Sequence, residues 1–416
     1  MGKPKIRFKG YEDDWEQRKL DNVAEFSKGR GYSKGDLIEL GTPIILYGRL
    51  YTNYETSISD VDTYVEAKDG SVYSRGGEVI VPASGESAED IARAATVDKS
   101  GILLGGDLNV VMPNEDINSG FLAISISNGN PQRELAKRAQ GKSVVHIHNE
   151  EIRNLRVPFP IKVEQNKIVE YFFNLDHLIT LHQRKCEETK SLKKYMLQKM
   201  FPENGKCVPK IRFSGFSDAW EQRKVTDLGE IYIGLVTTMT EHYTDKGHLL
   251  IRNSDIKDGY FEFGENPIYL DGEFSEQNKS RMHQLGDVIT VHTGDIGTSA
   301  VIGENEVNSI GFATIVTRPN QKILDSNYFA TYLNTDTHKQ WAISMATGDG
   351  RSNYNLKDYT KLVVPIPQIE EQKKIATCIG NLNNLITLHQ HKCDELQKLK
   401  KFMLQNMFVQ QFYNDF

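Results

Sequence analysis

Cysteine is scarce in this sequence. The chain of 416 residues holds four, and none is followed by a second cysteine three positions later, so neither a disulfide framework nor a paired-cysteine metal site is encoded. We expect reduced thiols in a cytoplasmic protein; the four are Cys186, Cys207, Cys378 and Cys393.

Long apolar runs are missing as well. No stretch approaches the roughly 18 to 20 consecutive apolar residues of a membrane span, and the segment from Met1 to Phe8 is not followed by the apolar core of a signal sequence. We therefore expect a soluble protein that is not exported and has no membrane partner.

Neither sign of charge dominates. Lys and Arg number 50 against 56 Asp and Glu, which gives a formal net charge of -6. This balance counts against a protein that coats nucleic acid over a wide surface, although it leaves room for local basic faces. At roughly 100 to 200 residues per domain, the length favours two to four domains.

Signatures of catalysis are also lacking. The segment Gly141-Lys142-Ser143 ends like a phosphate-binding loop, but Ala136 stands where the first glycine of that loop belongs. The His-Glu-x-x-His pattern of metalloproteases does not occur. We expect a protein that is not an enzyme on its own and binds neither a cofactor nor a metal ion.

An internal repeat is the strongest positive signal. The segment from Pro4 to Lys19 returns from Pro209 to Lys224 with 12 of 16 residues identical, and the segment from Asn174 to Phe201 returns from Asn381 to Phe408 with 19 of 28 identical. The residues between these segments look almost unrelated. The chain is therefore a tandem duplication, whose similar ends indicate one mechanical role performed twice and whose divergent bodies indicate two different recognition tasks.

Each longer repeat follows a Pro-x-Pro motif and has the pattern of a coiled-coil helix. Apolar residues recur at spacings of three and four, and about 38 residues per copy predict helices of roughly 57 Å that pair antiparallel about a pseudo-twofold axis. His182 with Cys186, and His389 with Cys393, could hold zinc if the two pairs met, but seam residues need no metal and we expect none. The predicted seam comprises Ile168, Phe172, Leu175, Ile179, Ile375, Ile379, Leu382 and Ile386.

Both bodies read as α/β or α+β domains with many glycine-rich loops. In the first body, the apolar runs 44–46, 79–81, 102–104, 109–112 and 122–126 predict strands, with helices near 88–95 and 132–138. In the second, 249–251, 288–291, 300–302 and 313–316 predict strands, with helices near 328–333 and 338–345. Gly77-Glu78-Val79-Ile80 and Gly286-Asp287-Val288-Ile289 suggest a shared strand.

The bodies carry polar, aromatic and basic loops whose side chains suit base edges and phosphates. Gly141 and Gly348 occupy the same place in the duplication, which makes the loops that follow them the best pair of equivalent contact loops. Our candidates for nucleic-acid binding are Lys28, Arg30, Arg49, Tyr51, Asn53, Asn130, Arg133, Lys142, Ser143, Arg252, Asn253, Thr293, Arg351, Ser352, Asn353 and Tyr354.

The order of these motifs resembles a known family. Two variable bodies, each closed by Pro-x-Pro and followed by Glu-Gln-x-Lys-Ile (164–168 and 371–375) and a long helix ending in Met-Phe, resemble the specificity (S) subunit of type I restriction-modification systems. The Trp-Glu-Gln-Arg-Lys segments (15–19 and 220–224) and Gly105-Gly106-Asp107-Leu108-Asn109 are similar to that family too. The resemblance spans essentially the whole chain.

The resemblance implies that each body is a target-recognition domain reading one half of a bipartite, asymmetric DNA sequence in the major groove. It implies a helical spacer that docks two methyltransferase (M) subunits, and restriction (R) subunits in the full complex, with S-adenosylmethionine, ATP and Mg on those partners. The implied domains are 1–163, the first target-recognition domain; 164–205, the first spacer helix; 206–369, the second target-recognition domain; and 370–416, the second spacer helix.

Two other functions stay open at this point. A two-headed coiled-coil scaffold that binds no DNA would show the same duplication and helices. A fused nuclease or methyltransferase would need catalytic motifs that the sequence lacks.

Overall fold

The computed structural model describes residues 3–141, 144–203, 205–346 and 353–409. The chain divides into two compact units, one formed by Met1–Gln183 with Gln390–Phe416 and the other by Arg184–His389. Each unit therefore contains one body together with part of each long helix. No helix in the described ranges is long and apolar enough to cross a membrane.

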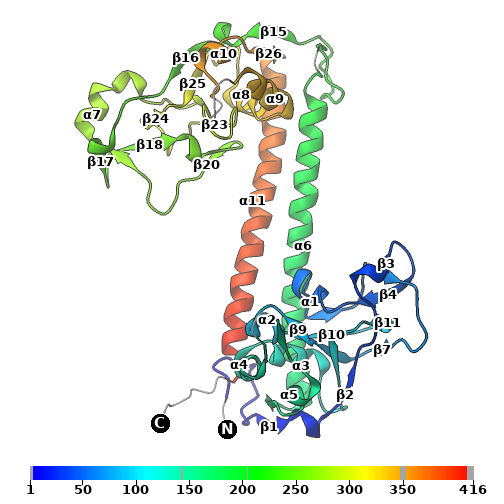
Figure 1. Cartoon of the computed structure of the whole chain (residues 1–416). Coiled ribbons are helices and arrows are strands. Elements are labelled where there is room, and N and C mark those ends of the chain that lie inside the picture. Colours follow the sequence, from blue (N-terminus) through cyan, green and yellow to red (C-terminus); the bar gives the residue numbers. More distant parts are fainter. Residues whose placement is uncertain (1–2, 142–143, 204, 347–352, 410–416) are drawn as a thin grey trace. The chain divides into compact units, whose positions relative to one another are not determined.

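The two long helices are α6 (Lys162–Met200) and α11 (Ile369–Asn406), of 39 and 38 residues (Figure 1). They pack antiparallel. In the first unit, Phe172 on α6 faces Phe408, just beyond the end of α11, and farther along α6 Asp176 pairs with Lys400. In the second unit, the thiol of Cys186 lies 3.9 Å from the carbonyl oxygen of Ile386.

The seam residues of both helices are buried or half-buried. Ile168, Phe172, Leu175 and Ile179 share one apolar cluster with the first body, and Ile375 belongs to a cluster with the second. Ile379 is also buried, whereas Leu382 and Ile386 are half-buried. The seam thus stabilises contacts between helix and body as well as contacts between helices.

The first body is built around two mixed sheets of five strands. All residues of β8 and the first four residues of β12 are buried, which places these two neighbouring strands in the centre of the body. The first sheet has the order β2 (Ala24–Lys28), β12 (Leu108–Pro113), β8 (Glu78–Pro82), β10 (Ala95–Val97) and β5 (Ser57–Ile58). The second has the order β3 (Leu37–Ile38), β6 (Tyr64–Val65), β4 (Thr42–Ile45), β11 (Ser100–Leu104) and β7 (Tyr73–Arg75), and β9 (Ser84–Gly85) pairs with β13 (Val145–His146).

The second body repeats this plan with four strands in each main sheet. The first sheet has the order β16 (Gly229–Ile233), β25 (Ile315–Pro319), β22 (Val288–Thr290) and β23 (Ser299–Val301). The second has the order β17 (Tyr243–Thr244), β21 (Tyr269–Leu270), β18 (His248–Arg252) and β24 (Ile310–Phe312), and β19 (Ile256–Lys257) pairs with β20 (Tyr260–Phe261).

The two bodies have the same fold although their sequences look unrelated. The order β2-β12-β8-β10 corresponds to β16-β25-β22-β23, and β3-β6-β4-β11 corresponds to β17-β21-β18-β24. In both bodies the third and fourth strands of the second sheet, β4 with β11 and β18 with β24, are parallel. The shared Gly-acid-Val-Ile strand predicted from the sequence is β8 in one body and β22 in the other.

The remaining helices are short. One prediction was wrong: residues 122–126 belong to a helix, α3, rather than to a strand. Asn118 begins this helix because its side chain accepts a hydrogen bond from the Phe121 amide (3.1 Å), and burial on all sides removes the helical periodicity from the sequence. The predicted helix 88–95 is also shorter than expected, since Ala95 begins β10. The helices are α1 (Arg49–Thr52), α2 (Ala88–Ile91), α3 (Ser119–Ile126), α4 (Gly129–Arg138), α5 (Asn149–Arg153), α7 (Gly272–Gln277), α8 (Ser326–Leu333), α9 (Asp336–Met345) and α10 (Leu356–Tyr359).

Candidate nucleic-acid interface

Each body is closed by a pair of strands built from repeated motifs. The strand β1 (Glu16–Lys19) pairs antiparallel with β14 (Arg156–Phe159), which holds the first proline of Pro-x-Pro. In the second unit β15 (Glu221–Lys224) pairs with β26 (Val363–Ile366) in the same way. The chain therefore enters and leaves each body at one place, directly before a long helix begins.

A buried ion pair joins each N-terminal motif to its long helix. In the first unit the guanidinium of Arg7 donates to both carboxylate oxygens of Glu164, at 2.6 and 2.8 Å. In the second unit Arg212 donates to both oxygens of Glu371, at 2.7 and 2.9 Å. Both carboxylates are fully buried, and the hydrogen bond from each pair raises the pKa of its arginine. A bidentate pair fixes the orientation of both groups.

The glutamine that follows each buried glutamate binds backbone atoms of the body. Gln165 accepts from the amide of Asn118 (2.8 Å) and donates to the carbonyl oxygen of Pro160 (2.9 Å). Gln372 accepts from the amide of Asp325 (2.9 Å) and donates to the carbonyl oxygen of Pro367 (2.9 Å). Each glutamine thus joins the start of a long helix to the N-cap of α3 or α8.

An aromatic cluster completes each junction. Trp15 packs against Phe121 of α3 and against Phe408, with ring centroids 5.6 and 6.1 Å apart. Trp220 likewise packs against Tyr328 of α8 (6.2 Å) and Phe201 (6.1 Å). We call the strand pair, the ion pair, the glutamine and this cluster the junction of each unit. The residues of both junctions lie in the repeated segments of the sequence, but the sequence alone does not show which of them contact one another.

In the first body, Lys28 at the end of β2 and Arg30 in the loop that follows are both exposed. Gly29 lies so close to the backbone that an added Cβ would sit 1.9 Å from the carbonyl oxygen of Gly105. The amide of Arg30 donates to the carbonyl oxygen of Leu104 (3.0 Å). Only glycine fits this close approach, so the two cations project from a fixed backbone.

Of the three candidates on and after α1, Arg49 and Tyr51 use their polar groups in hydrogen bonds within the body. The guanidinium of Arg49 donates to Asp62 and Glu55, both at 2.8 Å, and is largely buried. The hydroxyl of Tyr51 donates to the carbonyl oxygen of Ser84 (2.8 Å), and its burial raises its pKa. Asn53, just beyond α1, is exposed.

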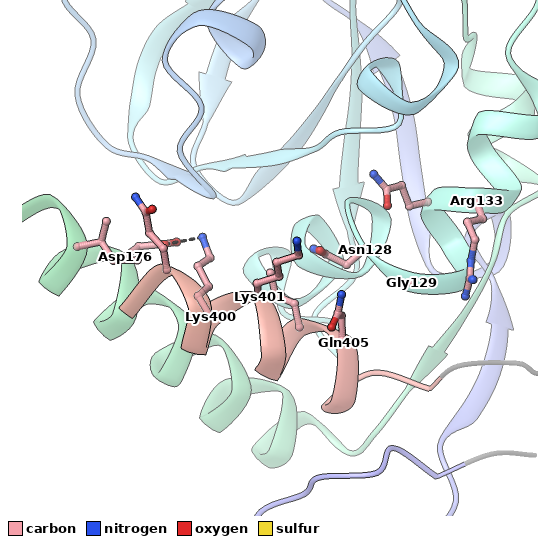
Figure 2. A pocket seen from close by; sticks show the side chains of 11 residues that line it. Asn128, Gly129, Arg133, Asp176, Lys400, Lys401 and Gln405 are labelled. Carbon is pink, nitrogen blue, oxygen red and sulfur yellow. Dashed lines mark hydrogen bonds and ion pairs between the residues drawn. The ribbon is translucent and has the colours of Figure 1, made fainter. Parts of the chain in front are cut away.

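The candidates Asn130 and Arg133 lie on α4, half-buried and exposed respectively. Arg133 lines a cleft between α4 and the long helices of the first unit (Figure 2). Lys142 and Ser143 lie outside the described residues, as do Gly348, Arg351 and Ser352 of the loop at the equivalent place in the duplication.

The second body brings three predicted loops together. Asn253 accepts from the amide of His292 (2.8 Å), and the hydroxyl of Thr293 donates to the side chain of Asn353 (2.7 Å). The amide of Tyr354 donates to the carbonyl oxygen of His292 (2.9 Å). Burial lowers the pKa of His292, which favours its neutral form. The result is a half-buried polar cluster of amide and hydroxyl groups from distant parts of the sequence.

Two candidates in this body have other contacts. Arg252 donates to both oxygens of Asp255, at 3.0 and 2.8 Å, and this hydrogen bonding raises its pKa. Tyr354 is fully buried and its ring packs against Trp341 and Tyr359. Tyr354 therefore packs in the core of the second body, and its contact with nucleic acid stays a prediction from the sequence.

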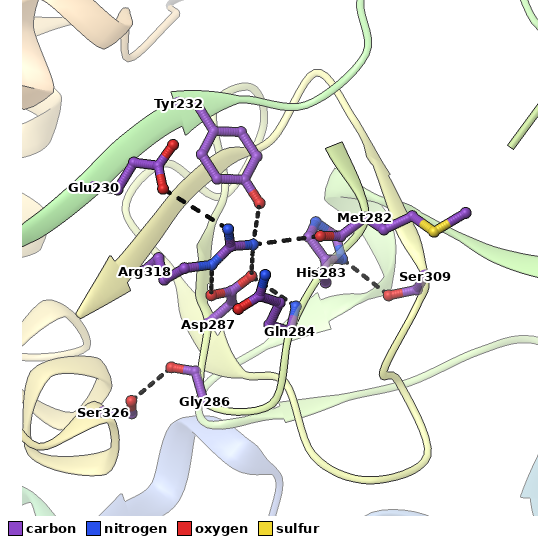
Figure 3. Close-up of polar contacts among 10 residues, drawn as sticks. All are labelled: Glu230, Tyr232, Met282, His283, Gln284, Gly286, Asp287, Ser309, Arg318 and Ser326. Carbon is purple, nitrogen blue, oxygen red and sulfur yellow. Dashed lines mark hydrogen bonds and ion pairs between the residues drawn. The ribbon is translucent and has the colours of Figure 1, made fainter. Parts of the chain in front are cut away.

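A buried charge network distinguishes the second body from the first (Figure 3). Arg318 on β25 donates to both carboxylate oxygens of Asp287, each at 2.9 Å, and to the hydroxyl of Tyr232 (3.1 Å). Strand register places Met112 where Arg318 stands, and Glu78 where Asp287 stands. The two bodies therefore share a fold, but only the second has an arginine–carboxylate pair at these positions of its first sheet.

Metal ligands do not gather in the described part of the chain. Among those residues, no group of three or more His, Cys, Asp and Glu side chains could hold an ion. In the long helices, the thiol of Cys393 accepts from the side-chain amide of Gln397 (3.6 Å).

Comparison with known proteins identifies the family. The family described as "Type I restriction modification DNA specificity domain" matches residues 12–191 and 217–398, so each copy of the duplication matches it separately. The chain belongs to the type I restriction-modification DNA specificity family. It is a DNA specificity subunit, the component of such a complex that is itself non-catalytic, and neither a DNA-independent scaffold nor a fused enzyme.

Relatives of this specificity subunit extend over nearly the whole chain. The MjaVIII specificity subunit of Methanocaldococcus jannaschii is 19% identical over 407 residues, covering 94% of this chain and 91% of the relative. The putative MjaX specificity subunit of the same organism is 24% identical over 415 residues, with the same coverage.

Solved structures share the fold of the specificity subunit. The S subunit from M. genitalium superposes with a TM-score of 0.63 at 13% identity, covering 99% of this chain and 100% of the other. A second structure, described as concerning complex assembly and conformational transition of the type I restriction-modification system, has a TM-score of 0.52 at 17% identity and covers 96% and 98%. The tandem α/β bodies with long antiparallel helices are confirmed.

Proposed function

We propose that each body reads one half of a bipartite, asymmetric DNA target through the major groove, and that α6 and α11 set the distance between the halves. The observation that carries this proposal is that the two bodies share one fold but differ in their loops. Strand order and junctions are the same in both units, whereas the loops between strands differ in length and sequence. A shared framework with divergent loops suits two different recognition tasks.

In the first body, we assign DNA contact to Lys28, Arg30, Asn53, Asn130 and Arg133. Arg49 and Tyr51 are candidates that stabilise the same body through internal hydrogen bonds. Lysine and arginine suit phosphates, and amides suit base edges. Lys142 and Ser143 remain candidates from the sequence.

In the second body, we assign DNA contact to the polar cluster of Asn253, Thr293 and Asn353, with Arg252 beside it. These side chains come from three loops, and direct recognition of base edges needs several hydrogen-bond donors and acceptors that lie close together. Arg351 and Ser352 directly precede Asn353 in the chain and remain candidates from the sequence.

The partners we propose are double-stranded DNA, two M subunits, and R subunits in the full complex, with S-adenosylmethionine, ATP and Mg held by those partners. Support for docking comes from apolar side chains that α6 and α11 expose at equivalent positions. Tyr195 and Phe402, one in each unit, are 51% and 53% exposed. Leu192 and Leu399 lie three residues earlier, on the same helix faces, and are also exposed.

The proposed function is tested by mapping methylated adenines in the genome with and without the gene. We expect loss of methylation at one bipartite motif with a fixed spacer, and its return when the gene is restored. A methylation pattern that does not change would overturn the proposal.

A further inference from the structure

A polar cleft in the first unit separates α4 from the long helices (Figure 2). Its volume is about 600 Å³. A second cleft of about 240 Å³ adjoins it and shares Asn128, Gln132, Lys400 and Leu404. The larger cleft is lined mainly by cationic and amide side chains, among them Arg133, Lys400, Lys401, Gln132, Gln397 and Gln405.

One carboxylate lies among these groups, and it is already engaged. Asp176 accepts a hydrogen bond from the hydroxyl of Thr56 (3.1 Å) and pairs with Lys400. Lys401 is exposed on the same helix, and Arg133 faces the cleft from α4. Figure 2 shows Lys401 and Gln405 projecting from α11 on one side and Arg133 from α4 on the other. Lys401 therefore adds a positive charge to the lining beyond the pair of Lys400 with Asp176.

The equivalent place in the second unit is arranged differently. The duplication aligns Lys400 with Lys193, and Asp176 with Asn383. Lys193 pairs at 3.0 Å with Asp258, which the turn between β19 and β20 supplies from the body. In the second unit the body thus contributes its own acid to this lysine, whereas in the first unit the acid comes from α6.

We propose that the cleft of the first unit binds a backbone phosphate of the DNA duplex beside the half-site that the first body reads. This inference rests on the proposed function. Lysine, arginine and amide groups are the side chains that contact DNA phosphates and sugars. A free nucleotide would find no stacking partner, because none of the residues that line the larger cleft is aromatic. A peptide would find no deep apolar anchor, because the apolar lining is confined to Ile179 and Leu404.

The test measures DNA affinity of the full chain, co-purified with its M subunits, as a function of salt. Lys401→Ala and Arg133→Ala should each make the slope of log affinity against log salt less steep by about 0.9, the value for one lost phosphate contact. Both variants should weaken binding equally on a duplex that carries the methylated motif and on a scrambled duplex. A phosphate contact carries no sequence information, so a loss confined to the motif would overturn the proposal.

Matched controls come from the second copy of the repeat. Lys194 is exposed and stands where Lys401 stands, so Lys194→Ala should leave the slope unchanged. Gln405→Lys should steepen the slope by about 0.9, and the equivalent Gln198→Lys should not. Equal slopes for all of these variants and the wild type would overturn the cleft assignment while leaving the proposed function intact. A wild-type complex that does not distinguish the two duplexes would instead overturn the proposed function.

Two further measurements separate other ligands. Inorganic phosphate could raise the melting temperature through Lys401 while the DNA slope stays unchanged, which would show a site for free anions and overturn the assignment to DNA. Loss of the M subunits from the Lys401→Ala complex, again with an unchanged slope, would show a protein contact and overturn it equally.

Discussion

At the scale of single residues, the junctions depend on carboxylates that have no access to water. Glu164 is fully buried and its charge is balanced by the two hydrogen bonds from Arg7. Removal of one partner from such a pair leaves an uncompensated buried charge, which costs about 3 to 5 kcal/mol. We expect Arg7→Met to destabilise the first unit by that amount, measured by urea unfolding and by faster amide exchange at the start of α6.

The control for this change is an ion pair on the surface. Arg18 pairs with Glu16 at 2.6 Å, but both side chains are substantially exposed, so Arg18→Met should cost less than about 1 kcal/mol. The double variant Arg7→Met with Glu164→Met should recover part of the lost stability, because no buried charge remains. Equal effects of Arg7→Met and Arg18→Met would show that the junction does not depend on the buried pair.

Two buried histidines make the second unit sensitive to acid. Burial, with a smaller contribution from Arg318, lowers the pKa of His283 to about 3, and burial lowers that of His338 to about 4, from an ordinary 6.5. The folded pKa lies below the unfolded one, so their contribution to stability is complete above pH 6.5 and declines as the pH falls toward 4. Unfolding free energy should therefore fall between pH 7 and 5.

The variant His283→Asn tests this pH dependence. Asparagine can keep a hydrogen bond to the hydroxyl of Ser309, which now lies 2.9 Å from Nδ1 of His283, and it does not titrate. We expect a shallower fall in unfolding free energy between pH 7 and 5 than in the wild type. Parallel curves for the two proteins would assign the acid sensitivity to other groups.

The sequence predicted which junction residues matter but not how they act. The identical Glu-Gln pairs at 164–165 and 371–372 were visible in the repeat, yet Arg7 lies 157 residues before its partner, and spacing alone gives no contact between them. The same limit applies to the polar cluster of the second body, where Asn253 meets His292 only because β18 and β22 end close together.

At the scale of elements, patterns with a clear period were predicted correctly and the one without a period was not. The long helices alternate apolar and charged residues over ten turns, whereas α3 is apolar on all sides. The duplication held the missing information, because an offset of 207 places α3 on the helix predicted at 328–333. Extended from the ends to the bodies, the repeat predicts a helix at residues 119–126 in place of a strand.

The exposed aromatic residues of the long helices give a prediction at this scale. If they anchor M subunits, Tyr195→Ala and Phe402→Ala should each weaken the binding of one M subunit by roughly 2 kcal/mol, about thirtyfold, as expected for an interface hot spot. Stoichiometry from native mass spectrometry should show one M subunit lost in each single variant and two in the double variant.

A polar neighbour on the same helix supplies the control. Gln198 is exposed three residues after Tyr195, so Gln198→Ala should keep both M subunits. Two M subunits retained in the Tyr195 and Phe402 double variant would place the docking surface elsewhere.

At the scale of the whole molecule, the junctions explain how two bodies diverged while their frames stayed alike. Gln165 and Gln372 hold the bodies through amide and carbonyl groups of the backbone, which every sequence supplies apart from the amide that proline lacks. Asn118 and Asp325 differ in type but present the same amide to the glutamine. The loops can therefore change without loss of the attachment, which is the property that a family of recognition subunits requires.

This argument predicts that a body can be exchanged between its closing strands. Replacement of residues 20–155 by the corresponding body of another specificity subunit should keep β1, β14 and both long helices in place. We expect the methylated motif to change in one half only, with the other half and the spacer length unchanged, because the second unit keeps its own strands and junction. Methylome sequencing of cells with the chimera measures all three features at once. A change in both halves would show that the bodies do not read the target independently, and a change in spacer length would show that the body, as well as the helices, sets the distance.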